Sequence, residues 1–310
     1  MSRAFVFPGQ GAQSIGMGRA LADAYPAARA VFDEVDAALG QSLSVLIWEG
    51  DMAALTLTRN AQPALMATSM AALAALEAEG VGMAHVSFVA GHSLGEYSAL
   101  CAAGAINLAD TAVLLRTRGL AMQDAVHVGV GAMAAVLGLD FDTVAAIAAE
   151  AAGNEVCQAA NDNDPAQVVI SGHVAAVERA MVLARAAGAK RALLLPVSAP
   201  FHCALMQPAA AVMAEALAGV VIENPVCPVV MNVRAEAVEE ASRIRDLLVA
   251  QVTGVVRWRE SVQWMERAEV SEYWEIGSGK ALSGMIKRTL EGEAVLRAVG
   301  LPADVIAAKG

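Results

Sequence analysis

Charged side chains are scarce in this chain of 310 residues: Asp, Glu, Lys and Arg together make up 17%, and aromatic residues only 4%. Basic residues are the scarcer kind, 21 against 32 acidic ones, so the formal net charge is −11. General nucleic-acid binding is excluded, because neutralising phosphates requires a basic surface. The hydrophobic content of 57% excludes a disordered or fibrous chain, and the length predicts one large domain with an insert or two domains.

The sequence also lacks a long apolar run. Its longest stretch without Asp, Glu, Lys or Arg spans residues 192–214, but prolines and polar side chains interrupt it, so we expect no membrane-spanning helix. No charged segment followed by an apolar one opens the chain, so we expect no signal peptide and a cytoplasmic location. The four cysteines have no CxxC spacing and the histidines no ligand spacing, so no disulfide framework, metal site or bound cofactor is predicted.

Strand, turn and helix patterns alternate in the first 126 residues. Residues 4–7 form a strand pattern that ends at the turn Pro8-Gly9-Gln10-Gly11. Residues 86–90 form a second one, which ends at Gly91-His92-Ser93-Leu94-Gly95. Helical patterns cover 16–25, 26–39, 61–79, 96–103 and 108–124. This alternation predicts an α/β fold.

Residues 127–198 have a pattern of their own. Strand, helix, strand, strand, helix and strand are predicted in that order, at 132–139, 142–152, 156–161, 167–172, 174–187 and 191–197. This βαββαβ order is ferredoxin-like. The predicted boundaries are therefore 127–198 for a small inserted subdomain, and 1–126 with 199–310 for a large α/β domain. In its second part we expect a helix near 205–217, a strand at 226–232 and only helices beyond.

Gly91-His92-Ser93-Leu94-Gly95 matches the G-x-S-x-G pattern of a nucleophile elbow. A serine in a tight turn between a strand and a helix has an exposed hydroxyl, and the helix N-terminus and the next backbone N–H stabilise an oxyanion. A serine between two glycines is often only a turn. The strand predicted before Ser93 and the helix predicted after it favour the nucleophile.

A serine nucleophile needs a base, and His202 is the best candidate. It follows a predicted strand end, where a loop side chain can reach a site. His92 adjoins Ser93 and is interpreted as structural or secondary, because neighbouring side chains in a turn point apart. The remaining histidines, without a partner motif, are His85, His127 and His173. No Asp or Glu is singled out as the group that would orient the base.

Arg118 is predicted to face inward. Its neighbours three or four positions away on the helix are apolar: Leu114, Leu115 and Met122. A buried guanidinium needs an anion, and a substrate carboxylate held by two hydrogen bonds would serve. An internal ion pair is the alternative. Arg116 has less apolar neighbours and is assigned to the surface or to the rim of the site.

Together these motifs resemble those of the malonyl-CoA:acyl carrier protein transacylase family, whose fold also forms the acyltransferase domains of polyketide and animal fatty-acid synthases. The match runs in order from about residue 4 to residue 290. Its segments are Phe7-Pro8-Gly9-Gln10-Gly11-Ala12-Gln13, Gly91-His92-Ser93-Leu94-Gly95-Glu96, Arg118-Gly119, Gln167-Val168-Val169-Ile170-Ser171-Gly172, Pro200-Phe201-His202, Gln251 and Arg257-Trp258. The resemblance implies a hydrolase-like large domain with a central, mainly parallel sheet and a ferredoxin-like insert.

The resemblance also implies the chemistry. The family transfers a malonyl group from malonyl-CoA to the phosphopantetheine thiol of acyl carrier protein, in a ping-pong reaction that supplies fatty acid synthesis. Ser93 would be the nucleophile and His202 the general base, oriented by the backbone carbonyl of Gln251 in place of a carboxylate. The backbone N–H groups of Gln10 and Leu94 would form the oxyanion hole.

Substrate-binding residues are implied in the same way. Arg118 would bind the malonyl carboxylate, and a Phe directly before the base, here Phe201, accompanies malonyl rather than methylmalonyl in the polyketide relatives. The other implied lining residues are Gln62, His92, Met122, Asn161 and Asn163. We expect malonyl-CoA and holo acyl carrier protein as partners, no nucleic acid, no membrane and a monomer.

Three other functions compete with this interpretation. A serine thioesterase would use the same Ser–His pair, and a malonyl transferase for a polyketide or malonate decarboxylase carrier would use the same chemistry. A non-catalytic protein on this fold is disfavoured, because the site residues occur together. The acidic carrier would need a local basic patch on this acidic chain. The candidates, each also interpretable as a solvated surface charge, are Lys190, Arg191, Lys280, Lys287 and Arg288.

Overall fold

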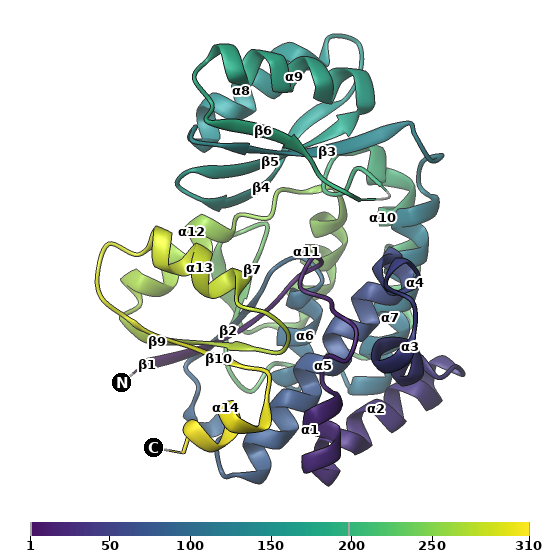
Figure 1. Ribbon diagram of the computed structural model, residues 1–310, viewed down its shortest axis with the longest axis vertical. Coiled ribbons are helices and arrows are strands. Elements are labelled where there is room, and N and C mark those ends of the chain that lie inside the picture. The colour runs from purple at the N-terminus through teal and green to yellow at the C-terminus, as the bar shows by residue number, and fades with distance from the viewer. Residues whose placement is uncertain (1, 198, 310) are drawn as a thin grey trace.

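The structure is a computed structural model that describes residues 2–197 and 199–309. Ser198, at the expected domain boundary, lies outside the described residues. The larger sheet has six strands in the order β10-β9-β1-β2-β7-β8 (Figure 1). They are β1 (Ser2–Phe7), β2 (Phe88–Gly91), β7 (Val229–Met231), β8 (Glu236–Val238), β9 (Val270–Ile276) and β10 (Val295–Val299). Neighbouring strands are parallel, except that β8 runs antiparallel to β7.

Helices cover both faces of this sheet. On one face Ala4 and Val6 of β1 share a core with Trp258 and other residues of α12 (Trp258–Arg267) and α13 (Ala281–Thr289). On the other face Phe5 and Phe7 share a core with the long helices that precede and follow β2. Successive side chains of a strand point to opposite faces, so burial of both faces makes the strand continuously apolar. This is the pattern that predicted a strand at residues 4–7.

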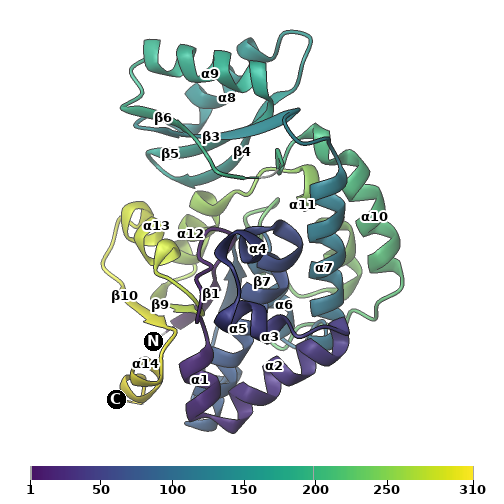
Figure 2. The same cartoon turned by 45° about the vertical axis from the view of Figure 1, so that its right-hand side comes forward.

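Besides α12 and α13, further helices of the larger part are shown around its sheet in Figures 1 and 2. They are α1 (Arg19–Ala24), α2 (Pro26–Leu39), α3 (Leu43–Glu49), α4 (Met52–Thr56), α5 (Thr58–Ala78), α6 (Gly95–Ala102), α7 (Leu108–Asp124), α10 (Gln207–Ala218), α11 (Ala241–Thr253) and α14 (Pro302–Ala307), with 3-10 turns at Met83–His85 and Ala204–Met206. Among the described residues, no helix combines the length and apolar character needed to cross a membrane.

A four-stranded antiparallel sheet forms the upper part of the molecule in Figure 1. Its strands, in the spatial order β4-β5-β3-β6, are β4 (Cys157–Asp164), β5 (Gln167–His173), β3 (Gly131–Leu137) and β6 (Arg191–Leu194). Along the chain they alternate with α8 (Phe141–Ala152) and α9 (Val174–Ala186) as β3-α8-β4-β5-α9-β6. Both helices lie on the outer face of this sheet, so its inner face is turned toward the larger part (Figures 1 and 2).

Strand β4 joins the smaller sheet to the larger part. The backbone N–H of Asp162 donates to the carbonyl of Val256 at 2.9 Å, and the Val256 N–H donates to Ala160 at 2.9 Å. Two buried carboxylates of β4 form ion pairs across the same junction: Asp162 with Arg259 at 2.9 Å, and Asp164 with Arg288 at 2.8 Å. Arg288, a candidate for carrier docking, is therefore engaged within the chain.

The expectation of only helices beyond residue 232 is wrong, because β8, β9 and β10 follow. Strand β9 was missed because two glutamates interrupt its apolar run. Glu272 forms an ion pair with Arg3 at 2.7 Å, and Glu275 accepts hydrogen bonds from the backbone N–H groups of Leu282 and Ser283. Buried carboxylates are tolerated in a strand when such partners satisfy them, and these partners are remote in sequence.

Candidate active site

The predicted nucleophile lies in a sharp turn between β2 and α6. Ser93 has a φ of 54°, in the left-handed region that non-glycine residues rarely adopt. Two glycines make the turn sterically feasible. A Cβ on Gly91 would lie 1.8 Å from the carbonyl oxygen of Gly95, and a Cβ on Gly95 would lie 2.2 Å from that of Phe7. The G-x-S-x-G spacing therefore reflects backbone contacts that leave no room for a side chain.

Ser93 and His202 are brought together over a sequence separation of 109 residues. The Ser93 Oγ lies 2.7 Å from Nε2 of His202, and Nδ1 of the same ring lies 2.9 Å from the backbone carbonyl oxygen of Gln251. A carbonyl can only accept, so Nδ1 carries the proton and Nε2 is left to accept from the serine hydroxyl. Burial, and then the nearby Arg118 cation, lower the pKa of His202 to about 3, so the imidazole is neutral and able to act as a base.

The predicted oxyanion-hole donors lie at the same turn. Leu94 caps the N-terminus of α6, and Gln10 lies in the turn after β1. That turn packs closely on the elbow, since a Cβ on Gly9 would lie 2.7 Å from the His92 carbonyl oxygen. Within the part of the chain that the structure describes, neither backbone N–H has a protein acceptor. Both are therefore available to a ligand oxygen.

Arg118 is 1% exposed and lies behind the nucleophile. Its Nη1 donates to Oε1 of Gln62 at 2.9 Å, and its Nη2 donates to Oε1 of Gln251 at 2.7 Å and to Ser93 Oγ at 3.2 Å. No ion pair among the described residues includes Arg118, and its Nε has no partner there. The alternative of an internal ion pair is thus not formed, and a buried cation with spare donor capacity is suited to bind an anion.

The other predicted lining residues surround this centre. Nε2 of His92 lies 2.8 Å from Oδ1 of Asn163, and Nε2 of Gln62 donates to Sδ of Met122 at 3.7 Å. His92 is thus hydrogen-bonded through its side chain to another of the predicted lining residues. Burial lowers its pKa, which keeps this ring neutral as well.

A cavity of about 640 Å³ opens between the inner face of the smaller sheet and the elbow. The predicted residues that line it are Gln10, His92, Ser93, Asn161, Asn163, Phe201 and His202. Those buried behind its wall are Gln62, Leu94, Arg118, Met122 and Gln251. Its volume is in the range of small-molecule sites, and Ser93 lies in its wall. No group of three or more His, Cys, Asp or Glu side chains in the described ranges could hold a metal ion.

Two residues at this centre were not predicted. Oδ1 of Asn232 accepts from the backbone N–H of Ser93 at 2.8 Å, and its Nδ2 donates to the carbonyl of Gly91 at 2.7 Å. Oε2 of Glu96 accepts from the backbone N–H of Asn232 at 2.6 Å, and burial raises the pKa of Glu96 to about 8. The position of Asn232 at the end of a predicted strand was the available signal, since polar residues there often serve a site.

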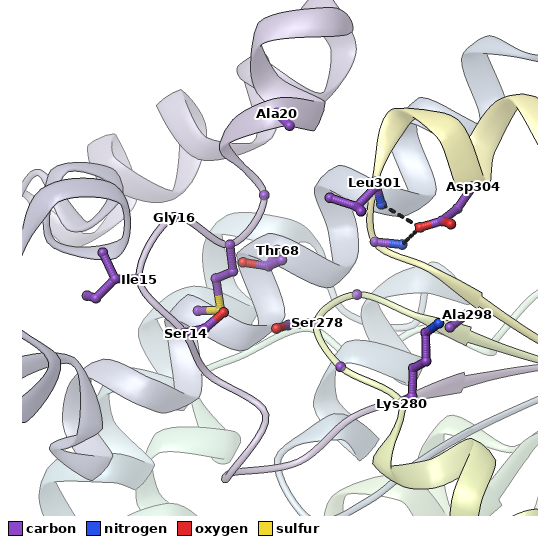
Figure 3. A pocket seen from close by; sticks show the side chains of 15 residues that line it. Ser14, Ile15, Gly16, Ala20, Thr68, Ser278, Lys280, Ala298, Leu301 and Asp304 are labelled. Atoms are coloured by element: carbon purple, nitrogen blue, oxygen red, sulfur yellow. Dashed lines mark hydrogen bonds between the residues drawn. The ribbon is translucent and has the colours of Figure 1, made fainter.

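A second cavity, of about 320 Å³, lies between the loops that follow β1, β9 and β10 (Figure 3). Lys280 and Asp304 provide its charged side chains. Oδ2 of Asp304 accepts from the backbone N–H groups of Gly300 and Leu301 at 3.1 and 2.9 Å, the contacts dashed in Figure 3. In the described part of the chain, none of the predicted site residues lines this cavity. The predicted lining residues thus belong to the larger cavity.

Comparison with known proteins places this geometry in a family. The sequence profile of the acyl transferase domain matches residues 4–301. Malonyl CoA-acyl carrier protein transacylases are similar over most of their length: that of Escherichia coli K12 is 47% identical over 93% of both chains, and that of Bacillus subtilis 47% identical over 92% of this chain and 89% of its own.

Solved structures agree with the sequence comparison. The acyl-carrier-protein-S-malonyltransferase of Bartonella henselae superposes with a TM-score of 0.96 at 53% identity, over 99% of this chain and 98% of its own. A malonyl-transacylase in complex with its type II PKS acyl-carrier protein superposes with a TM-score of 0.96 at 42% identity, over 99% of both chains. The chain therefore belongs to the acyl transferase family and, within it, to the malonyl CoA-acyl carrier protein transacylases.

Proposed function

We propose that this protein transfers a malonyl group from malonyl-CoA to the phosphopantetheine thiol of acyl carrier protein, supplying fatty acid synthesis. One observation carries the proposal: a buried guanidinium, Arg118, lies 3.2 Å from the Oγ of a serine that is hydrogen-bonded to a neutral histidine. A thioesterase has no general need for a cation at this point, whereas an acyl group that carries its own carboxylate requires one.

The first half-reaction forms malonyl-Ser93. The Oγ of Ser93 attacks the thioester carbonyl while its proton moves to Nε2 of His202, and the carbonyl oxygen becomes an oxyanion that the N–H groups of Leu94 and Gln10 stabilise. The C–S bond then breaks, and the CoA sulfur leaves with the proton that His202 returns. The backbone carbonyl of Gln251 fixes the ring in the tautomer that both transfers need.

The second half-reaction uses the same groups in reverse. The pantetheine thiol of the carrier gives its proton to His202 and attacks the ester carbonyl of malonyl-Ser93. When the C–O bond breaks, the Ser93 Oγ recovers the proton from His202, and the malonyl thioester of the carrier leaves. Throughout, the free carboxylate of the acyl group is bound by Arg118, within the region defined by Gln62, Met122 and Phe201. Water is disfavoured as the acceptor because the site is buried beneath the smaller sheet.

We propose further that residues 127–198 form an inserted ferredoxin-like subdomain and that 1–126 with 199–310 form a hydrolase-like domain. The βαββαβ order and the antiparallel strand order β4-β5-β3-β6 support the first assignment. The mainly parallel six-stranded sheet with its elbow serine supports the second. We also propose that the protein is a monomer in the cytoplasm. The four cysteines are free, which fits a reducing compartment.

Carrier docking is proposed at the basic residues beside the cavity. Lys280 immediately precedes Ala281, which is the first residue of α13 and part of the cavity wall, and Lys287 lies in the last turn of that helix. Both are exposed. Charge reversal at Lys287 is expected to raise the KM for the carrier while the KM for malonyl-CoA stays unchanged. An unchanged carrier KM would remove Lys287 from the docking surface.

A polyketide carrier is the second candidate acceptor. Its support is the 42% identity to a malonyl-transacylase solved with its type II PKS acyl-carrier protein. The half-reaction at Ser93 would be the same, so only the acceptor separates the two candidates. Transfer rates to the two kinds of holo carrier, compared at equal concentration, decide between them.

The function is tested by intact-protein mass after brief incubation with malonyl-CoA, followed by a chase with holo acyl carrier protein. A malonyl adduct that forms on the wild type, is absent from Ser93→Ala and moves to the carrier is the expected result. An adduct that decays to free malonate without reaching the carrier would support a thioesterase instead. An adduct that persists in Ser93→Ala would place the nucleophile elsewhere.

A further inference from the structure

Asn232 spans both sides of the turn that holds the nucleophile. It directly follows β7 at the carboxyl edge of the larger sheet, and it is 0% exposed. Its Oδ1 accepts from the backbone N–H of Ser93 at 2.8 Å, and its Nδ2 donates to the carbonyl of Gly91 at 2.7 Å. The buried Asn232 amide thus pairs with the backbone N–H of Ser93 and with the backbone carbonyl of Gly91.

The backbone at this point needs support. A φ of 54° is strained for serine and persists only where the surroundings fix it. The bond from Asn232 also occupies the N–H of Ser93 itself, whereas the N–H of Leu94 keeps no acceptor among the described residues. This division directs one N–H of the turn into the protein and the next toward the substrate oxygen.

The backbone of Asn232 is itself held by contacts with α6, which follows the turn, and with Arg257. Its backbone N–H donates to Oε2 of Glu96 at 2.6 Å, and its carbonyl accepts from the N–H of Arg257 at 3.0 Å. Strand β7 pairs with β2, with Val89 opposite Val229 and Ala90 opposite Val230. This register fixes the position of Asn232 along the sheet, beside the turn that follows β2. These contacts hold the Asn232 amide in one position. A side chain can orient another group only when it is itself held in this way.

We propose that Asn232 is a positioning residue for the nucleophile. Its amide holds the backbone of Ser93 in the left-handed conformation that directs Oγ to Nε2 of His202 and leaves the Leu94 N–H free for the oxyanion. The inference rests on the proposed function, because it concerns the rate at which malonyl-Ser93 forms. Asn232 does not touch the acyl group, so it acts on the chemical step and not on recognition of malonyl-CoA.

The test compares two variants at this position with a matched control. Asn232→Leu removes the hydrogen bonds to Ser93 and Gly91, and a longer one from Nε2 of Gln251 at 3.4 Å, at similar volume. Asn232→Asp keeps an acceptor for Ser93 but loses the donor to Gly91. Asn60→Leu is the control. Asn60 is also buried and its side chain also makes two hydrogen bonds, to Ala54 and from Arg116, but neither joins it to a residue of the site.

The rate of malonyl-Ser93 formation is measured by rapid quench and intact mass over a range of malonyl-CoA concentrations. For Asn232→Leu we expect the saturating rate to fall about 30-fold, equivalent to about 2 kcal/mol, with the half-saturating concentration within about threefold of wild type. For Asn232→Asp we expect an intermediate loss. The ratio of malonyl to acetyl transfer should stay at the wild-type value in both, and Asn60→Leu should keep the wild-type rate per folded molecule.

A merely structural role would give a different result. It would lower the rate of Asn232→Leu only in proportion to the folded fraction, as in the control, and that outcome would overturn the inference. If Asn232→Leu does not fold, Asn232→Asp decides by the same measurement, and a wild-type saturating rate in that variant would overturn it. A wild type that forms no malonyl adduct would refute the proposed function, whereas an active wild type matched by Asn232→Leu would refute the positioning role alone.

Discussion

Replacing Arg118 with alanine should separate recognition of the acyl group from the chemistry at Ser93. The guanidinium is 1% exposed, and its Nη2 lies 3.2 Å from Ser93 Oγ, so the carboxylate of a malonyl group bonded to Oγ falls within its reach. In the free protein the guanidinium donates to the amide oxygens of Gln62 and Gln251. Nε, which has no partner among the described residues, adds further capacity.

The size of the effect follows from these contacts. A hydrogen bond to a charged group contributes about 1.5–3 kcal/mol, and a guanidinium can give a carboxylate two of them. Part of this gain is offset, because the carboxylate must be desolvated and must compete with Gln62 and Gln251. We therefore expect Arg118→Ala to lower the rate of malonyl-Ser93 formation by about 30- to 300-fold, equivalent to about 2–3.4 kcal/mol.

The assay measures acyl-enzyme formation by rapid quench and mass, with malonyl-CoA and acetyl-CoA in parallel. Acetyl-CoA carries no free carboxylate, so its rate should fall by less than about fivefold, which reports any damage to the Ser93–His202 pair. Arg118→Lys is the matched control, because it keeps the charge but loses the planar pair of donors, and it should give an intermediate loss. Equal losses for malonyl and acetyl groups would refute the assignment of Arg118 as the carboxylate ligand.

Three further predictions follow from burial. Because burial and then Arg118 lower the pKa of His202 to about 3, the rate of malonyl-Ser93 formation should show no acidic limb between about pH 5.5 and pH 7.5; a limb near pH 6.5 would contradict this. Burial raises the pKa of Glu96 to about 8 from 4.5, so the folded state binds the proton more tightly than the unfolded chain. The free energy of unfolding should thus fall as pH rises from about 4.5 to about 8. In urea unfolding at these two pH values, this fall should be smaller in Glu96→Gln than in the wild type by about 4–5 kcal/mol, and an equal fall in both proteins would refute the prediction. Phe201 lines the cavity at 8% exposure, so Phe201→Ser should raise the ratio of methylmalonyl to malonyl adduct about tenfold in a competition measured by mass, and an unchanged ratio would dismiss its part in selectivity.

Much of the reacting centre could be anticipated because its signals are local. The apolar run at residues 4–7 and the glycines at 91 and 95 describe a strand and a turn whose steric needs are set by neighbouring atoms. The apolar neighbours of Arg118 on its helix likewise predicted an inward guanidinium, which is 1% exposed. Strands such as β9 were missed where buried glutamates broke the pattern, since their partners lie elsewhere in the chain.

The sequence by itself determined the residue types of the centre, the tight turn at Ser93 and the inward face that carries Arg118, because each depends on side chains a few positions apart. Only the tertiary structure decided what these groups touch. It brought Asn232 against the backbone of Ser93 across 139 residues, and it directed both the backbone and the side chain of Gln251 to different members of the site. The physical reason is that strand pairing and helix packing fix these distances, and no local pattern records which strand end lies beside which turn.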